Sequence, residues 1–188
     1  MSPFRLGAFA VAAAVMTACG PGRAEVQKFM NSCDGKLCSY FRLVLTPPDG
    51  WTIDQDATKK NNVQIMVPKG KNFANAPALI YVQVFYHRDK QQSLPDFAEV
   101  SNGRWRAHVK DAKISALPAV ERANGKAGFL RFAFENPSKA QQSYEVGAFG
   151  IDTDTDGNEF VLDVVVTGLN KDAVDAAEKD YVAFLKAH

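Results

Sequence analysis

The residue pattern best suited to chemistry is an acidic run late in the chain. It reads Asp-Thr-Asp-Thr-Asp-Gly over residues 152–157, and a further aspartate stands at the twelfth place. This spacing is typical of a calcium loop, in which alternate carboxylates surround a hard cation and the glycine allows a sharp turn. The candidate ligands are Asp152, Asp154, Asp156 and Asp163.

Three features of the same run favour a simpler interpretation. The flanking residues have strand-like rather than helix-like composition, Glu159 is charged where a calcium loop is usually apolar, and Asp163 is shorter than the usual bidentate glutamate. A polar hairpin tip that discourages pairing with other sheet edges explains the pattern equally well. We therefore expect a hairpin with no metal and no cofactor, and keep calcium binding as the alternative.

Asp163 also interrupts an otherwise apolar segment. In a strand, alternation places its side chain on the same face as Val161 and Val165. Two arrangements follow: a buried carboxylate paired with Arg131 or Lys126 on a neighbouring strand, or a carboxylate that faces solvent at a sheet edge. A structural ion pair is a better explanation than a catalytic acid.

The histidines provide little for catalysis. His87, His108 and His188 share no metal-ligand spacing, and the chain has no G-x-S-x-G, no H-E-x-x-H and no glycine-rich phosphate loop. His87 ends the most apolar predicted strand, where we expect a packing group, with ligand binding as the alternative. The sequence thus predicts that the protein is not an enzyme.

Composition sets the class of protein. The 188 residues are 46% hydrophobic with 13 Phe, enough for one core, and the net charge is +1. A balanced charge gives no basic face for phosphates, so nucleic acid is not an expected partner.

The first 18 residues read as an export signal. Arg5 supplies a positive start, and the apolar stretch over 6–15 is shorter than the roughly 20 residues of a membrane-spanning helix. The following Met-Thr-Ala-Cys-Gly at 16–20 resembles the lipobox of bacterial lipoproteins, although Met16 replaces the usual Leu. The resemblance implies cleavage before Cys19 and lipidation of that residue. Cleavage after Ala24 and an uncleaved anchor are the alternatives.

The residue after the lipidated cysteine suggests the destination. Gly20 differs from the Asp that resembles an inner-membrane retention signal, which favours an outer-membrane anchor facing the periplasm. The two remaining cysteines, Cys33 and Cys38, flank a turn-like stretch and are expected to form a local disulfide. A redox-active pair is disfavoured because the spacing is Cys-x4-Cys rather than Cys-x-x-Cys.

Periodicity and turn residues then define the elements. We expect strands near 40–45, 51–53, 62–67, 78–87, 116–122, 128–135, 142–151 and 159–167, with an Asn-Gly hairpin at 124–125. Two helices are expected, one capped by Ser93 and one capped by Asn170. The domain plan is a signal over 1–18, a lipidated tether with a small disulfide loop over 19–39, and one domain over 40–188.

The buried stripes of the helices follow from spacings of three and four. The expected stripes are Leu94, Phe97, Ser101, Trp105 and Val109 in the first helix, and Val174, Ala177, Tyr181, Phe184 and Leu185 in the second. Helices on opposite faces of a mostly antiparallel sheet give an α+β fold, a three-layer α/β/α sandwich.

Several of these sequence motifs resemble those of the PsbP-like family. They are the Leu-Thr-Pro-Pro-Asp-Gly-Trp opening at 45–51, the Val-Pro-Lys-Gly turn at 67–70, the strand that ends Phe-Tyr-His at 85–87, the Asn-Gly-Lys-Ala-Gly turn at 124–128 and the terminal helix. The chain looks most like the DcrB-like envelope branch of the Mog, PsbP and DcrB group. The resemblance implies a domain that binds other proteins rather than a catalyst.

The sequence therefore predicts a non-enzymatic envelope lipoprotein whose domain binds an unidentified protein partner in the periplasm, in an assembly, chaperone or immunity role. The alternatives are a calcium-binding or small-ligand-binding periplasmic module and an enzyme with a site near His87.

Overall fold

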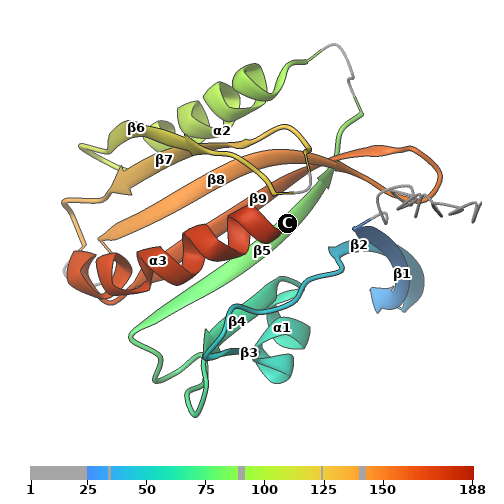
Figure 1. The fold of residues 1–188 in the computed structure, drawn as a ribbon, viewed down its shortest axis with the longest axis horizontal. Helices are drawn as coiled ribbons and strands as arrows, with labels where there is room; N and C mark the ends of the chain where they lie inside the picture. Colours follow the sequence, from blue (N-terminus) through green and yellow to red (C-terminus); the bar gives the residue numbers. More distant parts are fainter. Residues whose placement is uncertain (1–24, 34, 89–91, 124, 140–142) are drawn as a thin grey trace, which may run out of the picture.

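The computed structural model describes residues 25–188 apart from 34, 89–91, 124 and 140–142. The predicted signal and Cys19 lie outside the described residues. A seven-stranded antiparallel sheet, three helices and a separate two-stranded hairpin make up the fold (Figure 1). Across the sheet the strands run in the order β3-β4-β5-β9-β8-β7-β6. Among the described residues, no helix combines the length and the apolar character needed to cross a membrane.

The elements have the following bounds: β1 Val26–Cys33, β2 Lys36–Leu43, β3 Trp51–Ile53, α1 Gln55–Asn61, β4 Gln64–Pro68, β5 Ala78–Tyr86, α2 Leu94–His108, β6 Lys113–Val120, β7 Phe129–Glu135, β8 Tyr144–Thr153, β9 Glu159–Gly168 and α3 Lys171–Ala187.

Both faces of the central strands are covered, as the predicted apolar strands require. β9 pairs with β5 on one side and β8 on the other. Val164 of β9 faces α3 and is fully buried, while Val161 faces the opposite layer and is also fully buried. Continuous apolar runs in these strands follow from burial on both sides.

Helix α3 covers one face of the sheet, and its expected stripe is confirmed. All five predicted residues are buried. Asn170 caps the helix by accepting a hydrogen bond from the backbone N–H of Ala173. The Tyr181 hydroxyl donates to the Val164 carbonyl at 2.8 Å, so this buried phenol keeps a hydrogen bond inside the core.

Helices α1 and α2 cover the opposite face, and the three-layer prediction is confirmed. The Ser93–Asp96 capping box begins α2 as expected. All five residues of the predicted stripe are half-buried, and Leu94 and Phe97 pack against the core. The fully buried residues are Ala98 and Asn102, which lie beside that stripe. Helix α1 was not predicted, because it is short and its sequence shows no apolar repeat.

The N-terminal hairpin differs from the predicted tether. β1 and β2 pair in antiparallel register from Val26↔Leu43 to Cys33↔Lys36. Val26 and Leu43 belong to the main hydrophobic core and are 1% and 2% exposed. Burial of this apolar pair draws the segment onto the sheet. The folded domain therefore includes Val26, and the predicted boundary at residue 40 is wrong.

The β6–β7 connection is also longer than the predicted tight hairpin. β6 ends at Val120 and β7 begins at Phe129. Gly125 has a positive φ of 74°, which suits a glycine in a turn, while Asn124 lies outside the described residues. The extra length brings Arg122 back over the sheet, where it contributes to the polar network described below.

Candidate binding site and the polar networks beside it

The acidic run forms the β8–β9 turn, as the hairpin interpretation expected. Asp154 Oδ1 accepts hydrogen bonds from the backbone N–H groups of Asp156 and Asn158, both at 2.9 Å, and Oδ2 accepts one from the Asn158 side chain at 2.8 Å. Desolvation acts to raise the pKa of Asp154, but these hydrogen bonds outweigh it and lower the pKa below its usual value. Both carboxylate oxygens of Asp154 are thus engaged within the turn.

The four candidate calcium ligands do not converge. Asp152 is paired in register with Phe160 on the α3 face, and Asp163 is paired with Phe149 and Gln83 on the α1–α2 face. Asp152 also binds two cations, Arg122 Nη2 at 2.8 Å and Lys126 Nζ at 2.8 Å. In the described part of the chain, no group of three or more His, Cys, Asp or Glu is placed to hold a metal.

Asp163 has neither of its expected partners. Arg131 pairs with Glu178 of α3 and Lys126 pairs with Asp152, both on the other face of the sheet. Asp163 Oδ1 is buried, and within the described chain no group hydrogen-bonds to it. Burial, which is the larger cause, and the negative charge of Glu145 together raise the pKa of Asp163 to about 7. The expectation of an ion pair at this position, or of an exposed edge, is wrong.

A groove runs beside Asp163 on the α1–α2 face. Its volume is about 350 Å³, and its lining includes Tyr81, Glu145 and the exposed Phe73. Burial raises the pKa of Glu145, an effect that the nearby Lys139 opposes. Sequence reasoning missed the electrostatic interaction of Glu145 with Asp163, because the pairing of β8 with β9 brings these two residues onto the same face of the sheet.

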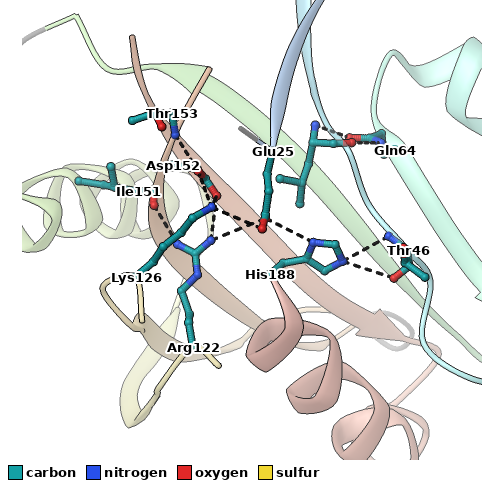
Figure 2. Close-up of polar contacts among 10 residues, drawn as sticks. Glu25, Thr46, Gln64, Arg122, Lys126, Ile151, Asp152, Thr153 and His188 are labelled. Atoms are coloured by element: carbon teal, nitrogen blue, oxygen red, sulfur yellow. Dashed lines mark hydrogen bonds and ion pairs between the residues drawn. The ribbon is translucent and has the colours of Figure 1, made fainter. Parts of the chain in front are cut away.

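A charged network fixes Glu25, the first described residue, to the rest of the domain (Figure 2). Glu25 lies 3.4 Å from Lys126 Nζ, 3.5 Å from His188 Nδ1 and 3.9 Å from Arg122 Nη2. The Arg122 and Asp152 side chains are 0% and 1% exposed, so water is excluded from the centre of the network. Four chain segments are therefore joined at one buried cluster.

Two further contacts hold the hairpin in place. The Gln64 side chain donates to the Leu43 carbonyl at 2.9 Å and accepts from the Leu43 N–H at 3.0 Å, which imitates a strand pairing. His188, the last residue, is 7% exposed and accepts from the Thr46 N–H at 3.3 Å (Figure 2). No spacing in the sequence relates Glu25 to His188, so these contacts could not be predicted.

His87 makes short-range contacts at the end of β5. It is 5% exposed, its Nε2 lies 2.9 Å from the Gln92 carbonyl and its Nδ1 lies 3.5 Å from the Glu159 carboxylate. Its backbone N–H donates to the Glu159 carbonyl at 2.9 Å. These contacts hold the segment that leaves β5 against the start of β9.

A cleft lies between the hairpin, the end of β5 and the β8–β9 turn. Its volume is about 550 Å³. Phe41 and Tyr86 form an aromatic wall with ring centroids 6.4 Å apart, and Tyr86 is 47% exposed. The polar lining carries both signs of charge, from Lys28, Arg88, Asp154 and Asp156. Such a cleft offers one aromatic contact surface inside a polar rim.

Of the three cysteines, only Cys38 has a side chain among the described residues. Cys38 is disulfide-bonded. The side chain of Cys33 lies outside the described residues, so the Cys33–Cys38 pairing stays a prediction, as does lipidation of Cys19.

Comparison of the sequence with known proteins does not assign the chain to a family. No family model matches the chain, and no curated protein matches its sequence. Among solved structures, the chain is similar to the Ran-binding protein Mog1p of Saccharomyces cerevisiae, with a TM-score of 0.45 and 13% identity over 85% of this chain and 93% of that one. This likeness concerns the path of the chain alone.

Proposed function

We propose that this chain is a non-enzymatic lipoprotein of a bacterial cell envelope, anchored through Cys19, whose domain binds a protein partner at the cleft beside Tyr86. The observation that carries the proposal is the cleft itself. Its half-exposed tyrosine stands among charges of both signs, and an aromatic anchor inside a polar rim is typical of protein–protein contacts.

The other polar groups support a binding role over a catalytic one. Arg122, Asp152 and Glu25 are engaged with one another, and Asp154 is engaged within its own turn. Asp154 lines the cleft, and its hydrogen bonds within the turn stabilise that wall before a partner binds. A preformed surface lowers the ordering cost of association.

The test is photo-cross-linking in intact envelopes. Benzoylphenylalanine at position 86 should give one discrete protein adduct, identified by mass spectrometry after immunopurification. The matched control is position 100, because Val100 is also 47% exposed but lies on α2 outside the cleft. Absence of a protein adduct at position 86, or the same adducts at both positions, would contradict the proposal.

A small-ligand-binding module is the second candidate, favoured by the cleft volume of about 550 Å³. Small-molecule sites commonly fall between roughly 300 and 1,000 Å³. Native mass spectrometry of protein gently isolated from envelopes should then show a bound mass that Tyr86→Ala removes. For calcium, we expect no change of melting temperature at millimolar concentrations, because the Asp154 carboxylate already bonds within its turn.

The anchor has a separate test. Intact mass spectrometry of the mature protein from native envelopes should show a start at Cys19 with a diacylglycerol and an amide-linked acyl chain. A start at Glu25 without lipid would instead make the domain a free periplasmic protein.

A further inference from the structure

The tip of the β1–β2 hairpin carries the most exposed apolar side chains near the start of the domain. Leu37 is 70% exposed and Met30 is 48% exposed. The register pairs Met30 with Ser39 and Leu37 with Ser32, so the two apolar side chains are diagonal neighbours on one face of the hairpin. Single exposed apolar residues are common on protein surfaces. Two adjacent ones on a projecting hairpin instead indicate a surface that binds something outside the domain.

The same face changes from buried to exposed along its length. At its base, Val26 and Leu43 are buried in the main core, while Phe41 packs against Phe160 with ring centroids 4.6 Å apart. The hairpin forms its own two-stranded sheet beside the end of β5 (Figure 1). The apolar side chains on this face thus continue beyond the edge of the core. At the tip, no other described part of the domain covers Met30 and Leu37.

Basic residues flank the exposed pair. Lys28 is exposed on the same face as Met30, and Lys36 is exposed next to Leu37 in the chain, with its side chain on the opposite face. On the opposite face, Arg42 lies over the Phe29 ring, with 3.8 Å from its guanidinium carbon to the ring centroid. Apolar side chains bordered by cations are typical of segments that rest in the headgroup region of a membrane, where anionic lipids attract lysine.

The length of chain before the hairpin limits where the tip can lie. Glu25 is bound to Lys126 and His188, so the chain is fixed to the domain at that residue. From Cys19 to Glu25 the backbone spans at most about 20 Å when fully extended. An anchor at Cys19 would keep the start of β1 close to the bilayer surface.

We propose that the tip of the hairpin, formed by Met30 and Leu37 with Lys28 and Lys36, rests on the phospholipid surface. This inference depends on the lipid anchor of the proposed function. The contact would give the domain one preferred orientation on the membrane, because the anchor alone is a single flexible attachment. The cleft beside Tyr86 has Lys28 in its lining, so it would be presented close to the bilayer.

The experiment supplies the anchor chemically. The chain from Cys19 to His188 is coupled through the Cys19 thiol to a maleimide-headgroup lipid, in vesicles of phosphatidylethanolamine and phosphatidylglycerol. Benzoylphenylalanine is placed at position 37 or, as the control, at position 100 on α2. After illumination, intact mass spectrometry should show phospholipid adducts at position 37 and none at position 100.

Other outcomes have defined meanings. No lipid adduct at position 37, or equal adducts at both positions, overturns the inference. Lys28→Glu with Lys36→Glu should lower the adduct yield at position 37, and an unchanged yield overturns the role of the two lysines. Because the chemical coupling provides the anchor, these results do not depend on whether cells lipidate Cys19. Lipidation in cells is tested separately, by the mass of the native protein. Position 37 is exposed, and an unchanged melting temperature confirms that each variant is folded.

Discussion

Two aspartates on the paired strands β8 and β9 have opposite surroundings. Asp152 lies on the α3 face, where Arg122 and Lys126 both bind it. Asp163 lies on the α1–α2 face, where its Oδ1 is buried without a hydrogen-bond partner among the described residues. The difference arises because the β6–β7 connection brings its cations to only one face. Removing a cation from the paired site leaves a buried charge uncompensated, whereas at the unpaired site ionisation of the carboxyl itself is unfavourable in the folded protein.

The largest expected effect comes from removing the cation of the paired site. Arg122→Ala leaves Asp152 and Glu25 buried with less positive charge, and we expect the free energy of unfolding to fall by about 3 kcal/mol. Urea denaturation measures this change. Arg106→Ala is the matched control, because Arg106 pairs with Glu99 at an exposed site and should cost at most about 1 kcal/mol. Equal losses in the two variants would show that burial of the network has no special role.

The unpaired site should respond in the opposite direction. Between pH 4 and 7 the unfolded chain ionises Asp163 while the folded protein keeps it protonated, because its pKa is raised to about 7. Stability should therefore fall as the pH rises through this window and become constant above it.

Asp163→Asn should remove this pH dependence. We expect the variant to be more stable than the parent at pH 8, by roughly 1–3 kcal/mol, and about equal to it near pH 4. Thermal unfolding at several pH values measures the difference. A variant that is less stable than the parent at pH 8 would mean that the Asp163 carboxylate is stabilised by a group in the chain.

A smaller effect is expected at the base of the hairpin. Gln64→Ala removes two hydrogen bonds to the Leu43 backbone, and the local opening free energy of residues 26–43 should fall by about 1 kcal/mol. Amide hydrogen exchange should then be roughly fivefold faster in that segment and unchanged in β9. Gln27→Ala is the control, since Gln27 is exposed on β1. Similar exchange in both variants would show that Gln64 does not hold the hairpin.

The smallest effect tests the coupling between the two carboxyls. Glu145→Gln removes a like charge near Asp163, so the pKa of Asp163 should move down toward its usual value. An NMR titration of the Asp163 carboxyl carbon measures the shift directly. Glu135→Gln, at an exposed position, should leave that titration unchanged. An unchanged pKa in Glu145→Gln would leave burial as the whole cause.

Much of the architecture was predictable because it depends on local patterns. The spacing of apolar residues in α3 identified all five of its buried residues, and the Ser93 and Asn170 caps marked where α2 and α3 begin. Turn residues placed the strands of the main sheet to within a few residues. The strand predicted near 40–45 overlaps β2, but β1 and α1 were missed, because β1 is buried only at its base and α1 contributes only Ala57 and Thr58 to the interior.

The candidate sites were predicted less well, since they depend on partners far apart in the chain. The polar nature of the β8–β9 turn was predicted correctly, and Asp154 satisfies its oxygens through residues within four positions. By contrast, the partners of Asp152 come from the β6–β7 connection, and the neighbour of Asp163 comes from a different strand.

The sequence by itself determined the strands of the main sheet, the two long helices and the three-layer arrangement, because hydrophobic periodicity and capping act over a few residues. Only the tertiary structure decided which charges meet. Strand register placed Asp152 and Asp163 on opposite faces, and the approach of the first described residue, Glu25, to the last, His188, closed the buried network. Electrostatic partners depend on distances in space, and those distances exist only once the sheet has formed.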